Sequence, residues 1–231
     1  MATLARTLNG PVTHLLYSAS GRLYIVVNKR DLYIFTGFSY KRLGTVAEDI
    51  HVLADSTFND KTDLFLGTAN GIYTLNGTTL RYDPASDTLP DKNISSIVVD
   101  GDVIWVGTRL GLCQLSQGQW TIYSTTDGLP SENILSLAML NGRLWSGTGD
   151  GVVAFSGRRF NVLNKLVADK ISVNGSEVVA GSLRGIARFT NRKWGQLIKP
   201  PGNNLNSLIH AGSVVAVASE QGLYLIDINK F

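Results

Sequence analysis

One short segment recurs along the chain at nearly constant spacing, and this repeat restricts the possible folds more than any other feature. Three copies, beginning at Asp63, Val103 and Arg143, are closely alike, and each runs through a Gly-Thr-x-x-Gly loop into further apolar residues. Two weaker copies and one degenerate copy complete a series whose closing residues are Asp31, Gly71, Gly111, Gly151, Gly185 and Gly222, with spacings of 40, 40, 40, 34 and 37 residues. A period near 40 residues is typical of four-stranded β-propeller blades.

Each repeat predicts four short strands. The inner strand is expected to begin near Val12, Ile50, Ile94, Ile134, Ile171 and Leu205 in the successive repeats. Dipeptides such as Asn141-Gly142 follow as hairpin turns that tolerate positive φ. A second, bulky strand ends in the Thr/Ser-x-x-Gly loop, whose glycine is expected in the left-handed conformation. No window shows the 3.6-residue period of a helix, so we expect essentially none.

The predicted fold is therefore all-β: a six-bladed β-propeller with four antiparallel strands per blade. It spans 1–231 as a single domain, with blades at about 10–47, 48–90, 91–131, 132–168, 169–202, and 203–231 plus 2–8. The chain stops at Phe231, where the sixth outer strand should begin, and Thr3–Leu8 precede the first inner strand without a blade of their own. We expect this N-terminal strand to close the last blade, making a complete domain without an open edge. The alternative is a frayed tail beside a three-stranded blade.

Two stretches carry a family resemblance. Thr126-Asp-Gly-Leu-Pro-Ser-Glu-Asn-Ile and Gly142-Arg-Leu-Trp-Ser-Gly-Thr-Gly-Asp-Gly151 resemble the two-component regulator propeller repeat, and the segment from Asp91 to Leu112 resembles it nearly as well. The resemblance is specific over the second to fourth repeats. It implies a propeller used as a sensory or protein-binding module in signalling, typically bacterial.

Composition narrows the chemistry. Three histidines and one cysteine, with no nucleophile elbow, phosphate loop or zinc motif, leave no catalytic residue, metal ligand or cofactor to assign. A net charge of +3 is too small and too evenly spread to predict nucleic-acid binding. No apolar run approaches about 18 residues, so we expect no membrane insertion. The location is cytoplasmic if Met1 is the native start, and periplasmic or extracellular if a signal peptide has been removed.

Polar side chains are predicted to line a central channel. Aligning the inner strands places about one residue per repeat at equivalent positions. Val52 is the apolar member, and the polar members are His14, Ser96, Ser136, Lys170 and Ser207. Small polar residues often line a channel that only holds water. A cation among serines could instead receive an anionic group, which makes Lys170 and His14 the stronger candidates.

Two further surfaces are candidates for partner contact. The longest connections run from an outer strand to the next inner strand on one face, where the candidates are Arg109, Asp91, Lys92, Glu132 and Asn133. Turns on the opposite face carry a basic patch of Arg143, Arg158, Arg159, Arg192 and Lys193. This patch could take an acidic partner or simply be a solvated rim.

We therefore expect a non-enzymatic interaction module, a scaffold that recognises a protein partner or ligand, in a sensory or multiprotein assembly. A small ligand or saccharide is also possible as the bound molecule. The alternatives are a propeller enzyme (a hydrolase, lyase or isomerase) and a lectin-like binder acting at the channel mouth. The enzyme would need several carboxylates or histidines converging there.

Overall fold

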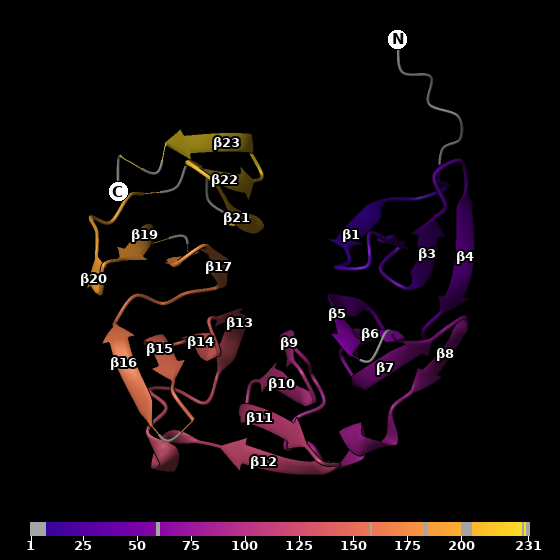
Figure 1. The fold of residues 1–231 in the computed structure, drawn as a ribbon, viewed down its shortest axis with the longest axis horizontal. Coiled ribbons are helices and arrows are strands. Elements are labelled where there is room, and N and C mark those ends of the chain that lie inside the picture. Colours follow the sequence, from indigo (N-terminus) through magenta and orange to yellow (C-terminus); the bar gives the residue numbers. More distant parts are fainter. Residues whose placement is uncertain are drawn as a thin grey trace. The chain divides into compact units, whose positions relative to one another are not determined.

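The protein is built from six antiparallel β-sheets that follow one another along the chain (Figure 1). The computed structural model describes residues 8–58, 61–157, 159–182, 184–199, 205–227 and 229. The first three sheets contain β1 (Val12–Tyr17), β2 (Leu23–Val27), β3 (Asp31–Phe35) and β4 (Tyr40–Thr45); β5 (Ile50–Phe58), β6 (Lys61–Thr68), β7 (Gly71–Asn76) and β8 (Thr79–Tyr82); and β9 (Ser96–Asp100), β10 (Val103–Thr108), β11 (Gly111–Ser116) and β12 (Gln119–Tyr123).

The remaining sheets contain β13 (Ile134–Leu140), β14 (Arg143–Thr148), β15 (Gly151–Phe155) and β16 (Phe160–Asn164); β17 (Lys170–Asn174), β18 (Glu177–Ser182), β19 (Gly185–Thr190) and β20 (Lys193–Trp194); and β21 (Ser207–Ala211), β22 (Val214–Ser219) and β23 (Gly222–Asp227). These sheets confirm the six-bladed β-propeller fold. Within the described residues the sixth sheet has three strands, and the N-terminal strand expected to complete it lies outside them.

Two compact units divide the chain. The first contains Met1–Val106 and Gln114–Thr121, and the second contains Gly107–Cys113 and Ile122–Phe231. The boundary passes through the third sheet, since β10 and β11 each have residues in both units.

Apolar side chains fill the space between neighbouring sheets of the same unit. In the first unit, Tyr24 and Val26 of β2 form one core with Leu64 and Leu66 of β6. Cores in the second unit join the fourth sheet to the fifth and the fifth to the sixth. Because side chains alternate between the faces of a strand, each blade needs apolar residues on both faces wherever it has two neighbours. Blade-like packing thus follows directly from the apolar second and third strands.

The repeated Thr-x-x-Gly loop is held by its threonine. The hydroxyl of Thr148, which is fully buried, donates to Gly151 O at 2.9 Å and accepts from Asp150 N at 3.2 Å. Thr68 and Thr108 make the same pair of contacts in their own repeats. The sequence pattern therefore encodes a turn closed by side-chain bonds to the backbone.

The glycine of this loop differs from the expectation. Gly151 has φ of +148°, which is positive but more extended than the left-handed helical conformation, and Gly111 has +130°. A Cβ at Gly151 would lie 2.3 Å from Asn164 O. Close approach of the outer strand, as well as φ, therefore requires glycine here.

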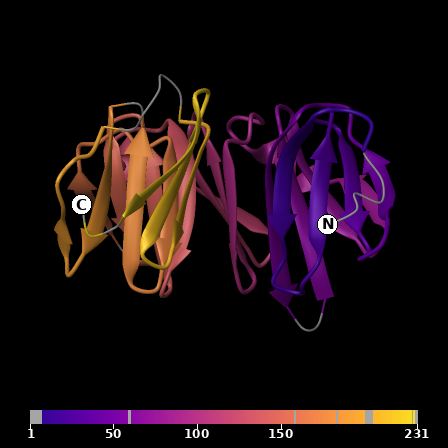
Figure 2. The same ribbon diagram turned by 90° about the horizontal axis from the view of Figure 1, so that it is seen from above.

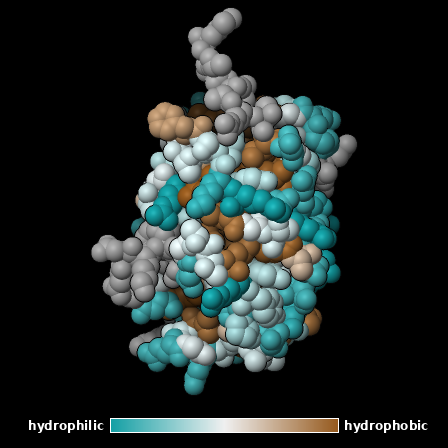
Figure 3. All heavy atoms as spheres, turned by 90° about the vertical axis from the view of Figure 1, so that its right-hand side faces the viewer, coloured by the Kyte–Doolittle hydropathy of each residue, from teal (hydrophilic) through white to brown (hydrophobic). Residues whose placement is uncertain are grey.

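Hairpin turns at the other ends of the strands behave as predicted. In Figure 2 the strands of each sheet run between turns at their two ends. Asn141 and Gly142 have φ of +51° and +69°, the pair of positive values that a type I′ turn requires. The outer strands carry exposed hydrophilic side chains, such as Lys41 and Arg42 on β4, together with partly buried apolar ones such as Leu43. Figure 3 shows hydrophilic and hydrophobic side chains mixed on the side formed by β4 and β8.

Two short 3-10 helices modify the expectation of no helix. They are η1 (Pro84–Thr88) and η2 (Thr125–Asp127), and each lies in a loop that leads from an outer strand to the next inner strand. Such helices have few residues and leave no 3.6-residue apolar pattern, which is why the sequence did not predict them.

Candidate partner-binding loops

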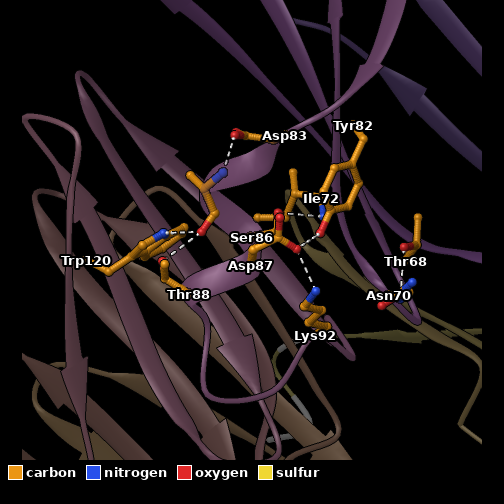
Figure 4. A network of polar contacts seen from close by, with 11 residues as sticks. Thr68, Asn70, Ile72, Tyr82, Asp83, Ser86, Asp87, Thr88, Lys92 and Trp120 are labelled. Atoms are coloured by element: carbon orange, nitrogen blue, oxygen red, sulfur yellow. Dashed lines mark hydrogen bonds and ion pairs between the residues drawn. The ribbon is translucent and has the colours of Figure 1, made fainter.

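The β8–β9 loop of the first unit is closely held to its own sheet. Asp83 caps η1 by accepting from Ala85 N at 3.0 Å, and Pro84 occupies the first turn, where no N–H is needed. The buried hydroxyl of Ser86 accepts from Ile72 N at 3.0 Å, and Trp120 Nε1 donates to Ala85 O at 2.9 Å (Figure 4). The loop therefore has a defined conformation set by contacts to β7 and β12.

Three polar side chains meet on this loop. Asp87 Oδ1 accepts from Lys92 Nζ at 2.6 Å and from Tyr82 Oη at 2.9 Å (Figure 4). The hydrogen bond from Lys92 and then that from Tyr82 lower the pKa of the Asp87 carboxyl, while burial and then the bond to Asp87 raise the pKa of Tyr82. Asp87 therefore stays ionised and Tyr82 neutral near neutral pH. This arrangement presents a partly exposed pair of opposite charges on the loop.

The β12–β13 loop of the second unit has the same construction. Ser124 and Asp127 form a capping box around η2: Asp127 Oδ2 accepts from Ser124 N at 2.9 Å, and Ser124 Oγ accepts from Thr126 N at 3.2 Å. Gly128 ends the turn with φ of +101°, and Leu129 is buried. The Asp-Gly-Leu-Pro motif thus works as a helix cap, a left-handed corner and an apolar anchor.

Both loops are tied to the Thr-x-x-Gly loops at an equivalent position. Gly71 N donates to Lys92 O at 2.7 Å, and Gly111 N donates to Glu132 O at 3.0 Å. The backbone of these two predicted contact residues is therefore fixed, and their side chains project from it with opposite charge. Glu132 Oε1 also accepts from Thr125 Oγ1 at 3.4 Å.

The other predicted face residues are partly engaged in the loop itself. Asp91 Oδ1 accepts from Asn93 N at 2.9 Å, and Asn133 N donates to Ser131 Oγ at 3.3 Å. In both loops, the side chain two residues before the asparagine accepts a hydrogen bond from the asparagine N–H. Arg109 is exposed in the β10–β11 loop. Asp91, a predicted contact, thus has at least a structural role.

The channel candidates divide between the two units. In the first, His14 on β1 is half-buried with Nδ1 3.2 Å from Thr13 Oγ1, and Ser96 at the start of β9 is buried. In the second, Ser136 Oγ donates to Ala168 O at 3.1 Å, which gives this buried serine a structural bond. Lys170 and Ser207 begin their inner strands, half-buried and exposed respectively.

Four residues of the predicted basic patch are described, and Arg158 lies outside the described residues. Arg159, Arg192 and Lys193 are exposed, and Arg143 is half-buried with its guanidinium 5.4 Å from the centre of the Trp145 ring. That distance permits a cation–π contact. These four residues lie in or next to the β13–β14, β15–β16 and β19–β20 turns, at one end of the fourth and fifth sheets.

Several polar residues escaped the sequence analysis. Asp87 pairs with Lys92 across five residues of loop, a spacing that follows no helical or strand pattern. Glu177 on β18 accepts from Arg188 and Thr190 on β19, and its Oε2 lies 3.6 Å from Nε2 of the buried His210. Asp169, directly before Lys170, has a pKa raised by burial. The only relevant sequence signal is the alternation of residues along each strand. That alternation indicates which face of the sheet a side chain lies on, but it does not identify the side chain's partner on another strand.

Two general properties of the described residues bear on function. No group of three or more His, Cys, Asp or Glu side chains in that part of the chain is arranged to hold a metal ion. None of the helices described there is long and apolar enough to cross a membrane.

Comparison with known proteins supports the fold. No family model and no curated protein match the chain. Among solved structures, the extracellular domain of BT4673 from B. thetaiotaomicron, described as a hybrid two-component system, is 17% identical with a TM-score of 0.61 over 93% of this chain and 38% of that one. BBS1N, solved in complex with ARL6DN, is 12% identical with a TM-score of 0.66 over 95% and 79% of the two chains.

A computationally designed protein, Ika8, is also similar, at 13% identity and a TM-score of 0.68 over 96% of this chain and 73% of that one. The chain thus spans little more than a third of the bacterial extracellular domain's length. At these identities the similarity shows the fold alone. The chain has the six-bladed β-propeller fold.

Proposed function

We propose that this protein is a non-enzymatic binding module that contacts a protein partner through outer-to-inner loops. The candidates are the β8–β9 loop of the first unit and the β12–β13 loop of the second, each taken by itself. The observation that carries the proposal is the shared construction of the two loops. Each is capped, anchored by a buried leucine and tied to a Thr-x-x-Gly glycine, yet each presents charged side chains to solvent. A loop that is already ordered loses little conformational entropy on binding, so its contacts contribute more to affinity.

The resemblance to regulator propeller repeats and the similar solved structures support this assignment. The repeat family implies sensory or protein-binding use. One similar structure is the extracellular domain of a two-component system, and another was solved in a protein complex. A role in bacterial signalling is the finer form of the proposal. The enzyme and lectin alternatives remain open to the same experiment, which would recover a bound saccharide as well as a protein.

The experiment is affinity capture with the full chain as bait, followed by identification of the bound molecule and calorimetric titration. Variants are Asp87→Asn with Lys92→Gln, which removes the charge pair, and Glu132→Gln. The control is Lys41→Gln, an exposed lysine of β4. We expect a stable protein partner whose affinity falls up to about fivefold in the loop variants, since an exposed ion pair contributes up to about 1 kcal/mol.

Thermal unfolding of each variant separates lost contact from lost structure. Wild-type affinity in all loop variants would overturn the assignment of these loops. Recovery of a saccharide or small ligand in place of a protein would overturn the assignment of the partner.

A further inference from the structure

A second surface lies at one end of the fourth and fifth sheets, within the second unit. It consists of Arg143, Arg159, Arg192 and Lys193, called here the cationic end. Arg143 directly follows the β13–β14 turn, and Arg159 lies in the β15–β16 turn. Alternate turns of an antiparallel sheet lie at the same end, so both residues belong to one end of the fourth sheet.

Aromatic contacts bring the fifth sheet's turn to the same end. The Trp145 ring lies 4.9 Å from Phe189 and 6.5 Å from Trp194, measured between ring centres. Trp145 is two residues from Arg143, and Trp194 directly follows Lys193. Trp145 belongs to the buried core between the two sheets, and the partly buried Phe189 and Trp194 pack against that core. Among the cationic residues, Arg143 lies over the Trp145 ring.

Arg192 has an unusual backbone. The β19–β20 turn is Asn191-Arg192, with φ of +49° and +63°. The turns Gln117-Gly118 and Asn141-Gly142 also have two positive φ values, and their second residue is glycine. The Asn28-Lys29 turn has a lysine in that second position, and Lys29 pairs with Asp49. Arginine, with a Cβ, is disfavoured in this conformation. Arginine therefore occupies a turn position at which other hairpins of this chain have glycine. Keeping a residue that its backbone conformation disfavours indicates a role for the side chain.

The four cations have no ion pair among the residues that the structure describes. None of the ion pairs in that part of the chain includes Arg143, Arg159, Arg192 or Lys193. Glu177, on a neighbouring strand of the fifth sheet, is already paired with Arg188. The cationic end therefore has uncompensated positive charge.

We propose that the cationic end binds an acidic segment of a partner protein. Arginine guanidinium groups bind carboxylates through paired hydrogen bonds, and three of these four residues are arginines. Val162, 51% exposed on β16 two residues beyond Phe160, adds an apolar contact beside the charges. A peptide with carboxylates and apolar residues matches this mixture, whereas a nucleic-acid backbone calls for a denser track of cations. This surface is separate from the loops assigned above, so either assignment can fail alone.

The test uses the full chain and a short fluorescein-labelled peptide rich in Glu with interspersed Leu, measured by fluorescence anisotropy. The peptide with Gln in place of Glu, duplex DNA and phosphatidylserine vesicles are the comparison ligands. The variants are Arg192→Gly and Arg192→Asn, which suit the turn but remove the charge, and Arg192→Lys, which keeps it. Lys165→Asn is the control, because Lys165 follows β16 at the opposite end of the same sheet.

We expect saturable binding of the Glu peptide, about fivefold weaker in Arg192→Gly and Arg192→Asn and near wild type in Arg192→Lys and Lys165→Asn. Because glycine and asparagine suit positive φ, both neutral variants should unfold at or above the wild-type temperature, so weaker binding cannot reflect misfolding. The proposal is overturned by equal affinity of wild type and the neutral variants, by no preference over the Gln peptide, or by preferred binding of DNA or vesicles.

Discussion

Thr148→Val tests whether the threonine hydroxyl of the repeat is a structural requirement. Thr148 is fully buried, and its hydroxyl donates to Gly151 O and accepts from Asp150 N. Valine has almost the same shape, so the substitution removes the hydrogen bonds without leaving a cavity. Gly151 is itself buried, and its carbonyl would lose this donor. An unsatisfied buried polar group costs about 1–3 kcal/mol, so we expect a loss of about 2 kcal/mol.

Urea unfolding followed by tryptophan fluorescence measures this change, because Trp145 lies on the same strand. For a chain of this length, about 2 kcal/mol lowers the melting temperature by roughly 4–8 °C. Thr148→Ser retains the hydroxyl and should lose under about 1 kcal/mol, the contribution of one methyl group. Thr79→Val, at an exposed position of β8, is the matched control. A Thr148→Val loss no larger than that of Thr79→Val would refute the structural role of the hydroxyl.

Two further predictions concern charge and loop order. The hydrogen bond from the Arg188 guanidinium lowers the pKa of the Glu177 carboxyl below its ordinary value of 4.5. The ionised carboxylate therefore stabilises the fold above pH 4.5. This stabilisation is lost as the pH falls through the lowered pKa of Glu177 in the folded protein. Urea unfolding between pH 6 and pH 3 should therefore show a smaller acid-side decline for Glu177→Gln than for wild type, and equal declines would contradict this. Trp120→Phe removes the bond to Ala85 O, and faster hydrogen exchange confined to η1 is expected. Unchanged exchange there would show that the indole is not what orders the loop.

Much of the fold follows from local sequence signals. The spacing of the closing glycines predicts one sheet per repeat, since each repeat is too short to form a core alone and long enough for four strands. Dipeptides such as Asn141-Gly142 specify the hairpins because few residues accept positive φ. Inner-strand starts were correct at Val12 and Ile134, whereas β9 and β21 begin two residues after the predicted Ile94 and Leu205. Apolar residues can be buried before regular strand pairing starts, so burial did not locate these boundaries.

The candidate site was less accessible from sequence. Lys92 and Glu132 were identified as loop residues, but their backbone bonds to Gly71 and Gly111 connect segments about 20 residues apart. The partner of Lys92 is Asp87, and nothing in their spacing predicts the pair because the intervening loop is irregular. Ser136 was a channel candidate, yet its hydroxyl is bonded to a buried carbonyl. Aligning the repeats places polar residues in the loops and inner strands. The hydrogen bonds of those residues depend on segments that lie far apart in the sequence.

By itself the sequence determined the repeat, the strand order within each sheet and the turn positions, because these depend on residues close together along the chain. The tertiary structure alone decided which side chains meet across strands and sheets. Arg192 shows the difference: its sequence predicts only a basic turn, while the folded chain places it in a glycine-like conformation near the aromatic core. Contacts of that kind depend on how neighbouring sheets pack, which no local pattern specifies.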